Sequence, residues 1–147
     1  MIPDLHPAIG GSRGNRYCGP GALAILTGLD TQATAAAIRK ASGKPAVRAV
    51  HHMDLVTAGI ALGLHLARQH MYDSTGTLRA WAARQEPGRY LVNVTGHYVV
   101  VRVNLLREVE VADNQSVYPL PLARFKRAGQ RVKRAWVVGN KPTAGSV

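Results

Sequence analysis

The chain has 147 residues, of which 46% are hydrophobic and 5% aromatic, with one cysteine and a formal net charge of +11. This length and apolar content fit one core of ordinary size, so we expect residues 1–147 to form a single domain. A single cysteine excludes an intramolecular disulfide and a zinc site built on several cysteines. The chain starts without a secretory pattern, and no apolar run reaches membrane-spanning length. We therefore predict a cytoplasmic protein with no membrane partner.

The first half of the chain has helical patterns. A helix is predicted to begin just after Cys18, because Pro20 fits its first turn and Gly28 fits its C-terminal end. Three further helices are predicted over residues 32–42, 51–62 and 75–85, with caps at Asp30 or Thr31 for the first of these and at Ser74 or Thr75 for the last.

From Arg89 onward, alternation of β-branched and polar residues is typical of strands. The segment 120–129 is interpreted as a short helix or an irregular crossover. A loose tail is expected over residues 139–147, so the ordered core spans about 15–138. Helices followed by strands indicate the α+β class rather than a doubly wound parallel sheet. The strands are predicted over residues 89–94, 97–103, 108–113 and 132–138.

The second and third predicted strands can form a hairpin. A short loop would place Arg102 opposite Glu108 and His97 opposite Asp113. Because side chains alternate between the two faces of a strand, His97 and Asp113 share the valine-rich face, and Tyr98 lies on the other, solvated face. The imidazole and the carboxylate can serve catalysis, or they can form an ordinary hydrogen-bonded pair at the rim of the core.

Cys18 lies just before the predicted first helix. The unpaired N–H groups and the positive end of the helix dipole favour a thiolate there, and a nearby imidazolium lowers the thiol pKa further. Gly19 is expected to leave open space beside the sulfur, and the Cys18 N–H can bind an oxyanion. The alternative is that Cys18 is a small buried apolar residue, as many free cysteines are.

The segments NRYCGPGALAIL, GHYVVVRV and VEVADN resemble the papain-like cysteine peptidases, and in particular the bacteriocin-processing, double-glycine-leader type with its stand-alone relatives. The resemblance implies a papain-like fold, with an N-terminal helical half packed on a C-terminal antiparallel sheet. It also implies that Cys18 is the nucleophile, that His97 is the general base and acid, and that Asp113 orients His97.

The sequence departs from the family pattern at two positions. The family usually has a glutamine, which completes the oxyanion hole, at the position of Ser12, and Asn15 is the nearest amide that could replace it. A proline usually follows the aspartate, where this chain has Asn114. Loss of one oxyanion donor costs about 10²–10³ in rate, so these departures also fit a weakly active or inactive domain.

The remaining charged residues suggest a polyanion surface rather than a metal site. The histidines show no zinc-peptidase pattern, so we expect neither a metal nor a cofactor. Basic residues crowd the C-terminal third, where they would attract nucleic acid without sequence specificity. These residues are Arg124, Lys126, Arg127, Arg131, Lys133 and Arg134.

The sequence leaves three functions open. The first is a cysteine peptidase that hydrolyses peptide or isopeptide bonds of a peptide or protein substrate. The second is a deamidase or transamidase with the same triad, because the acyl-enzyme step is shared. The third is an inactive, basic papain-like domain that serves as a binding or structural subunit of a nucleic-acid-containing assembly.

Overall fold

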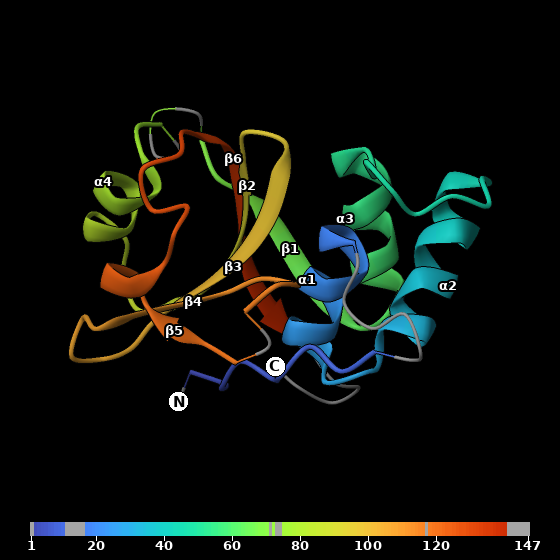
Figure 1. Ribbon diagram of the computed structural model, residues 1–147, viewed down its shortest axis with the longest axis horizontal. Helices are drawn as coiled ribbons and strands as arrows, with labels where there is room; N and C mark the ends of the chain where they lie inside the picture. Colours follow the sequence, from blue (N-terminus) through green and yellow to red (C-terminus); the bar gives the residue numbers. More distant parts are fainter. Residues whose placement is uncertain (1, 11–16, 71, 73–74, 117, 141–147) are drawn as a thin grey trace, which may run out of the picture.

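One antiparallel sheet is covered on both faces in the computed structural model, which describes residues 2–10, 17–70, 72, 75–116 and 118–140 (Figure 1). The helices are α1 Cys18–Thr27, α2 Thr31–Ser42, α3 His52–Ala61 and α4 Leu78–Ala83. The strands are β1 Leu64–Arg68, β2 Gly88–Val94, β3 His97–Val103, β4 Val109–Ala112, β5 Leu120–Pro121 and β6 Val132–Asn140. Helices α1–α3 lie on one side of the sheet and α4 on the other. The predicted α+β class is confirmed.

Local signals end the first two helices and begin the second. Gly28 ends α1 in the left-handed conformation with φ 79°, where its N–H donates to the carbonyl of Ala24. The Asp30 carboxylate caps α2 by accepting the N–H of Ala33 at 2.8 Å, and Gly43 ends the helix with φ 71°. Both helices were predicted, because capping side chains and left-handed glycines act over a few residues.

The third helix matches its prediction more closely than the fourth helix does. His51 caps α3, since its Nδ1 accepts the N–H of Met53 at 3.2 Å. The predicted start of the fourth helix at residue 75 is wrong, because Thr77 is its cap. The chain before it pairs with the sheet instead, where the N–H of Val132 donates to Gly76 at 2.8 Å. The alternative predicted cap, Ser74, lies outside the described residues.

The strand order of the sheet is β1-β6-β2-β3-β4-β5, with antiparallel pairs throughout. The four predicted strands are confirmed, whereas β1 and β5 were not predicted. Strand β6 continues through Asn140, so residues 139 and 140, which the sequence assigned to the tail, belong to the sheet, and residues 141–147 lie outside the described part. The segment after β4 is an irregular crossover that contains β5 and a short 3₁₀ helix, η2 Leu122–Arg124.

The predicted register of the β3–β4 hairpin is wrong by two residues. Arg102 pairs with Glu110 rather than Glu108. The reason is a longer loop, in which the Asn104 side chain accepts the N–H groups of Leu106 and Glu108, both at 2.9 Å. A shift of two residues leaves each side chain on its predicted face, because strand side chains alternate with period two.

Both faces of the sheet are buried. Val99 and Val101 pack with Trp81 of α4 on one face, whereas Tyr98 and Val100 pack with α1–α3 on the other. The prediction that the Tyr98 face is solvated is therefore wrong, because the helical half covers it. Within the described residues, no helix has the length and apolar content needed to cross a membrane.

Candidate active site

The start of α1 and the start of β3 bring the cysteine and a histidine together. Cys18 is partly buried and belongs to the first turn of α1. Burial raises the pKa of the Cys18 thiol, but hydrogen bonds from the His97 ring and from the backbone N–H of Tyr98 outweigh it. The net pKa lies below the usual value, so the site favours the thiolate.

His97 bridges the sulfur and a carboxylate. Its side chain is almost fully buried, and its Nε2 lies 2.8 Å from Oδ2 of Asp113. Burial lowers the pKa of His97, and the positive charge of Arg127 also lowers it slightly. The interactions with Asp113 and Cys18 raise this pKa by more than those two effects lower it. The net pKa is raised, and since Nε2 is occupied, Nδ1 is the ring nitrogen that can serve the sulfur. The two shifts together favour a thiolate–imidazolium pair.

Asp113 is held by the turn that follows β4. Its Oδ1 accepts the backbone N–H groups of Gln115 and Ser116, both at 2.9 Å, while its own N–H donates to the Ser116 hydroxyl at 2.9 Å. Burial raises the pKa of Asp113, but the hydrogen bonds from His97 and Gln115 outweigh it and the net pKa is lowered. The carboxylate is therefore ionised and fixed in orientation toward His97.

Two glycines of α1 position the helix. A Cβ on Gly19 would stand 3.1 Å from Cγ2 of Val50, so the predicted open space beside the sulfur is wrong at this residue. A Cβ on Gly21 would stand 2.6 Å from Cβ of Asn114. Asn114, which occupies the position of the family's proline, is 5% exposed. The helix that carries Cys18 thus packs directly against the residue after Asp113.

One candidate donor to an oxyanion lies at the start of α1. Ser12 and Asn15, the positions that the sequence singled out for a side-chain donor, lie outside the described residues. The backbone N–H of Cys18 stands at the start of α1, where a helix leaves its first N–H groups without a helical partner. It also contributes to the lowered pKa of the Cys18 thiol. One backbone donor is therefore available at the sulfur.

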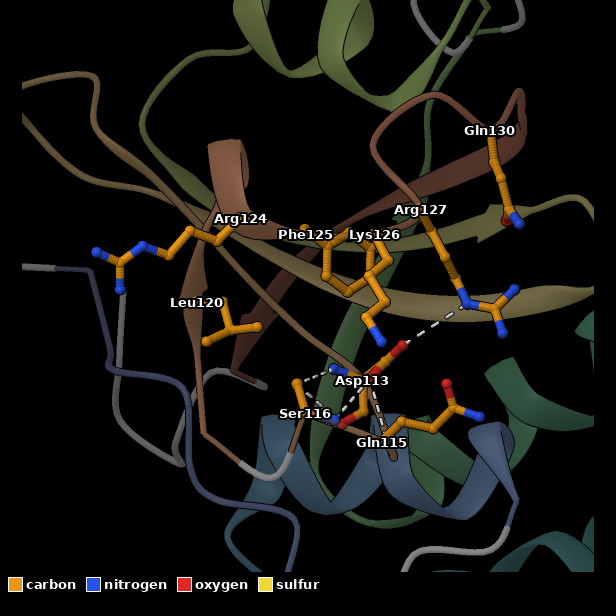
Figure 2. A pocket seen from close by; sticks show the side chains of 9 residues that line it. All are labelled: Asp113, Gln115, Ser116, Leu120, Arg124, Phe125, Lys126, Arg127 and Gln130. Carbon is orange, nitrogen blue, oxygen red and sulfur yellow. Dashed lines mark hydrogen bonds and ion pairs between the residues drawn. The ribbon is translucent and has the colours of Figure 1, made fainter.

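A pocket of about 320 Å³ opens beside Asp113 (Figure 2). Its wall includes Gln115, Ser116 and Gln130, which the sequence reasoning missed. The spacing of Ser116 after Asp113 is typical of an Asx-type turn and could have identified that residue. Gln130 arrives from the end of the crossover, which no local pattern connects to Asp113.

The predicted basic residues are divided between the pocket and the sheet. Within the described structure, the pocket wall includes three of them, whereas Arg131 and Lys133 are exposed near the start of β6. Arg134 donates to Oδ1 of Asn93 at 2.9 Å. The pocket members of the set are Arg124, Lys126 and Arg127.

Comparison with known proteins does not assign the site. The chain matches no protein-family model, no curated protein and no solved structure. In the described part of the chain, no group of three or more His, Cys, Asp or Glu side chains could hold a metal ion. The chemistry is thus assigned from the geometry of Cys18, His97 and Asp113, which suits nucleophilic attack by a thiolate.

Proposed function

We propose that this protein is a papain-like cysteine peptidase with Cys18, His97 and Asp113 as its catalytic triad. The observation that carries the proposal is the buried 2.8 Å contact between His97 Nε2 and Asp113 Oδ2, on a ring that also lowers the pKa of the Cys18 thiol. A nucleophile, a base and a group that orients the base are the three parts that thiol acyl transfer requires.

The fold supports the same proposal. The nucleophile starts a buried helix, the base starts the neighbouring strand β3, and the carboxylate follows β4. This order of elements is the one that the resemblance to papain-like peptidases implies. It buries α1 from Gly19 to Leu26 and leaves Cys18 partly exposed, so that a substrate can approach the sulfur.

The proposed reaction has an acylation and a deacylation step. The Cys18 thiolate attacks the carbonyl carbon of the scissile amide, while the Cys18 backbone N–H stabilises the oxyanion. His97 then gives its Nδ1 proton to the departing amine, and a thioester remains on the sulfur. A water molecule, deprotonated by His97, attacks the thioester carbonyl and displaces the Cys18 thiolate, which releases the acid and leaves His97 protonated as at the start.

The test is cleavage of a complex peptide library, with new termini identified by mass spectrometry. We expect new termini with the wild-type protein and none with Cys18→Ala, whose circular dichroism should match the wild type. A product one mass unit heavier, or one that has gained an amine, would instead show a deamidase or a transamidase. A wild-type protein that modifies no peptide would contradict the proposal.

The binding-subunit alternative has less support. A structural domain needs neither a thiol pKa lowered by a histidine nor a buried carboxylate behind that histidine. The exposed Arg131 and Lys133 remain the residues through which such a subunit would contact nucleic acid. Biological function that survives Cys18→Ala but not charge reversal at these two positions would favour it.

A further inference from the structure

The pocket beside Asp113 contains cationic side chains that are available to a ligand. Arg127 Nε lies 4.0 Å from Oδ2 of Asp113, and its two terminal nitrogens have no hydrogen-bond partner among the described residues. Lys126, which also lines the pocket, is exposed and makes no ion pair in the described part of the chain. Figure 2 shows the Lys126 ammonium and the Arg127 guanidinium on the side of the pocket nearest Asp113.

The nearby carboxylate does not neutralise these cations. Both oxygens of Asp113 already accept hydrogen bonds, Oδ2 from His97 and Oδ1 from the turn after β4. Because His97 itself favours the charged form, the Asp113 charge is compensated before Lys126 and Arg127 are counted. The pocket therefore offers two cationic side chains to an incoming anion.

A second polar group in the pocket lacks a hydrogen-bond donor among the described residues. The side-chain oxygen of Gln130 is buried and accepts no hydrogen bond from the described residues. In Figure 2 the Gln130 and Gln115 side chains lie at the same end of the pocket as the Arg127 guanidinium. A buried acceptor without a donor costs free energy, which a ligand N–H would recover.

The size and wall of the pocket favour a peptide over a nucleic acid. A volume of about 320 Å³ suits one side chain with its backbone amide. Oligonucleotides bind along extended basic grooves with stacked aromatic rings, whereas the only aromatic residue among the described residues of this wall, Phe125, is 7% exposed.

We propose that this pocket binds an acidic side chain of the peptide substrate, with its carboxylate on Arg127 and Lys126 and a peptide N–H on the Gln130 side chain. The proposal rests on the proposed function only in naming the ligand a substrate. The protein would then prefer scissile bonds with Asp or Glu at one fixed position relative to the bond.

The first experiment needs no catalysis. Cys18→Ala labelled with ¹⁵N is titrated with N-acetyl-glutamate amide and, separately, with N-acetyl-glutamine amide, which differ in a single ionised group. We expect the glutamate compound to shift the amide signals of Gln115, Ser116 and Gln130 at concentrations at least about tenfold lower, as charge-assisted hydrogen bonds allow. Replacing both cations, by Lys126→Gln with Arg127→Gln, should remove this difference.

The matched control is Lys40→Gln with Arg48→Gln. It removes the same two charge types from exposed positions outside the pocket, so the difference between the two compounds should persist. Equal shifts from both compounds, or none at the pocket, would overturn the proposal. A thymidine 20-mer that shifts these signals more strongly than the glutamate compound would also overturn it, in favour of a nucleic-acid surface.

The second experiment uses the peptide library. The ratio of cleavage at bonds with a nearby Asp or Glu to cleavage at neutral bonds should fall about tenfold in the pocket double variant and stay constant in the control. Equal cleavage of both kinds of bond by the wild type would contradict the proposed acidic preference but not the proposed peptidase activity. Binding of the glutamate compound at the pocket without cleavage of any peptide would support the anion pocket and contradict the proposed peptidase activity.

Discussion

Gly21 of α1 and Asn114 after β4 are in such close contact that a Cβ on the glycine would lie 3.0 Å from the Cα of Asn114. The contact is with backbone, so a rotamer change of Asn114 cannot relieve it. Because Asn114 follows Asp113, this contact sets the distance between the helix that bears Cys18 and the turn that bears the Asp113 carboxylate.

Gly21→Ala is therefore expected to disturb both stability and the triad. Glycine to alanine inside a helix gains about 0.5–1 kcal/mol, whereas overpacking costs about 1–3 kcal/mol. We expect a lower free energy of unfolding in urea and slower alkylation of Cys18. Gly129→Ala is the control, since its Cβ would meet no atom within 4 Å, and it should change the unfolding free energy by less than about 0.5 kcal/mol. Wild-type stability and alkylation in Gly21→Ala would refute the argument.

Iodoacetamide at mildly acidic pH should distinguish an activated thiol from an ordinary one. His97 lowers the pKa of Cys18, so at mildly acidic pH a larger fraction of the wild-type thiol is ionised than of an isolated thiol, which is almost fully protonated there. We expect His97→Ala to be alkylated at least about tenfold more slowly. In urea the two proteins should react at one rate, and equal rates in the folded state would remove the case for a triad.

The Asp113–His97 pair should stabilise the fold only within a window of pH. The pKa of Asp113 is lowered on folding, so its contribution is present above about 3.8 and is lost as the pH falls through the folded value. The pKa of His97 is raised, so its contribution is complete below about 6.5 and is lost as the pH rises through the folded value.

The stability difference between a Cys18→Ala protein and the same protein with Asp113→Asn should accordingly be greatest between about pH 3.8 and 6.5. Removal of the thiol from both proteins keeps its own titration out of the comparison. Urea unfolding at a series of pH values gives the measurement. A difference that does not vary with pH would show that the two groups are not paired as ions.

Arg127 should act on His97 from a distance. Its positive charge lowers the pKa of His97, so Arg127→Gln should raise that pKa. The ring signals of His97 in an NMR titration of Cys18→Ala report the change. Arg124→Gln is the control, because Arg124 points toward the opposite side of the pocket in Figure 2 and is not among the groups that shift the pKa of His97. An unchanged or lower pKa in Arg127→Gln would contradict the prediction.

The parts of the fold that were predicted correctly depend on neighbours in sequence. Gly28 and Gly43 end helices by their own backbone conformation, and Asp30 caps a helix with its own side chain. Strand β1 was missed because it is short and finds its partner β6 from the far end of the chain. The hairpin register was wrong because the Asn104 side chain organises a longer loop than the strand pattern indicates.

In the candidate site, too, the features that depend on local sequence were predicted and those that depend on distant contacts were missed. His97 and Asp113 were assigned to one face from alternation alone, and their contact tolerates the register error because a shift of two residues keeps the face. The pocket wall was not foreseen, since Gln130 reaches it through an irregular crossover. The close contact of Gly21 with Asn114 likewise joins elements that lie far apart in sequence.

The position of β6 between β1 and β2 has a consequence for synthesis on the ribosome. The segments that carry Cys18, His97 and Asp113 emerge from the exit tunnel before this strand does, and until it arrives β1 lacks its only partner in the sheet and β2 lacks one of two. A nascent chain that stops short of Val132 therefore carries Cys18, His97 and Asp113 on an incomplete sheet. The final arrangement of Cys18, His97 and Asp113 should consequently form late in translation, after β6 has inserted itself between two strands that were made earlier.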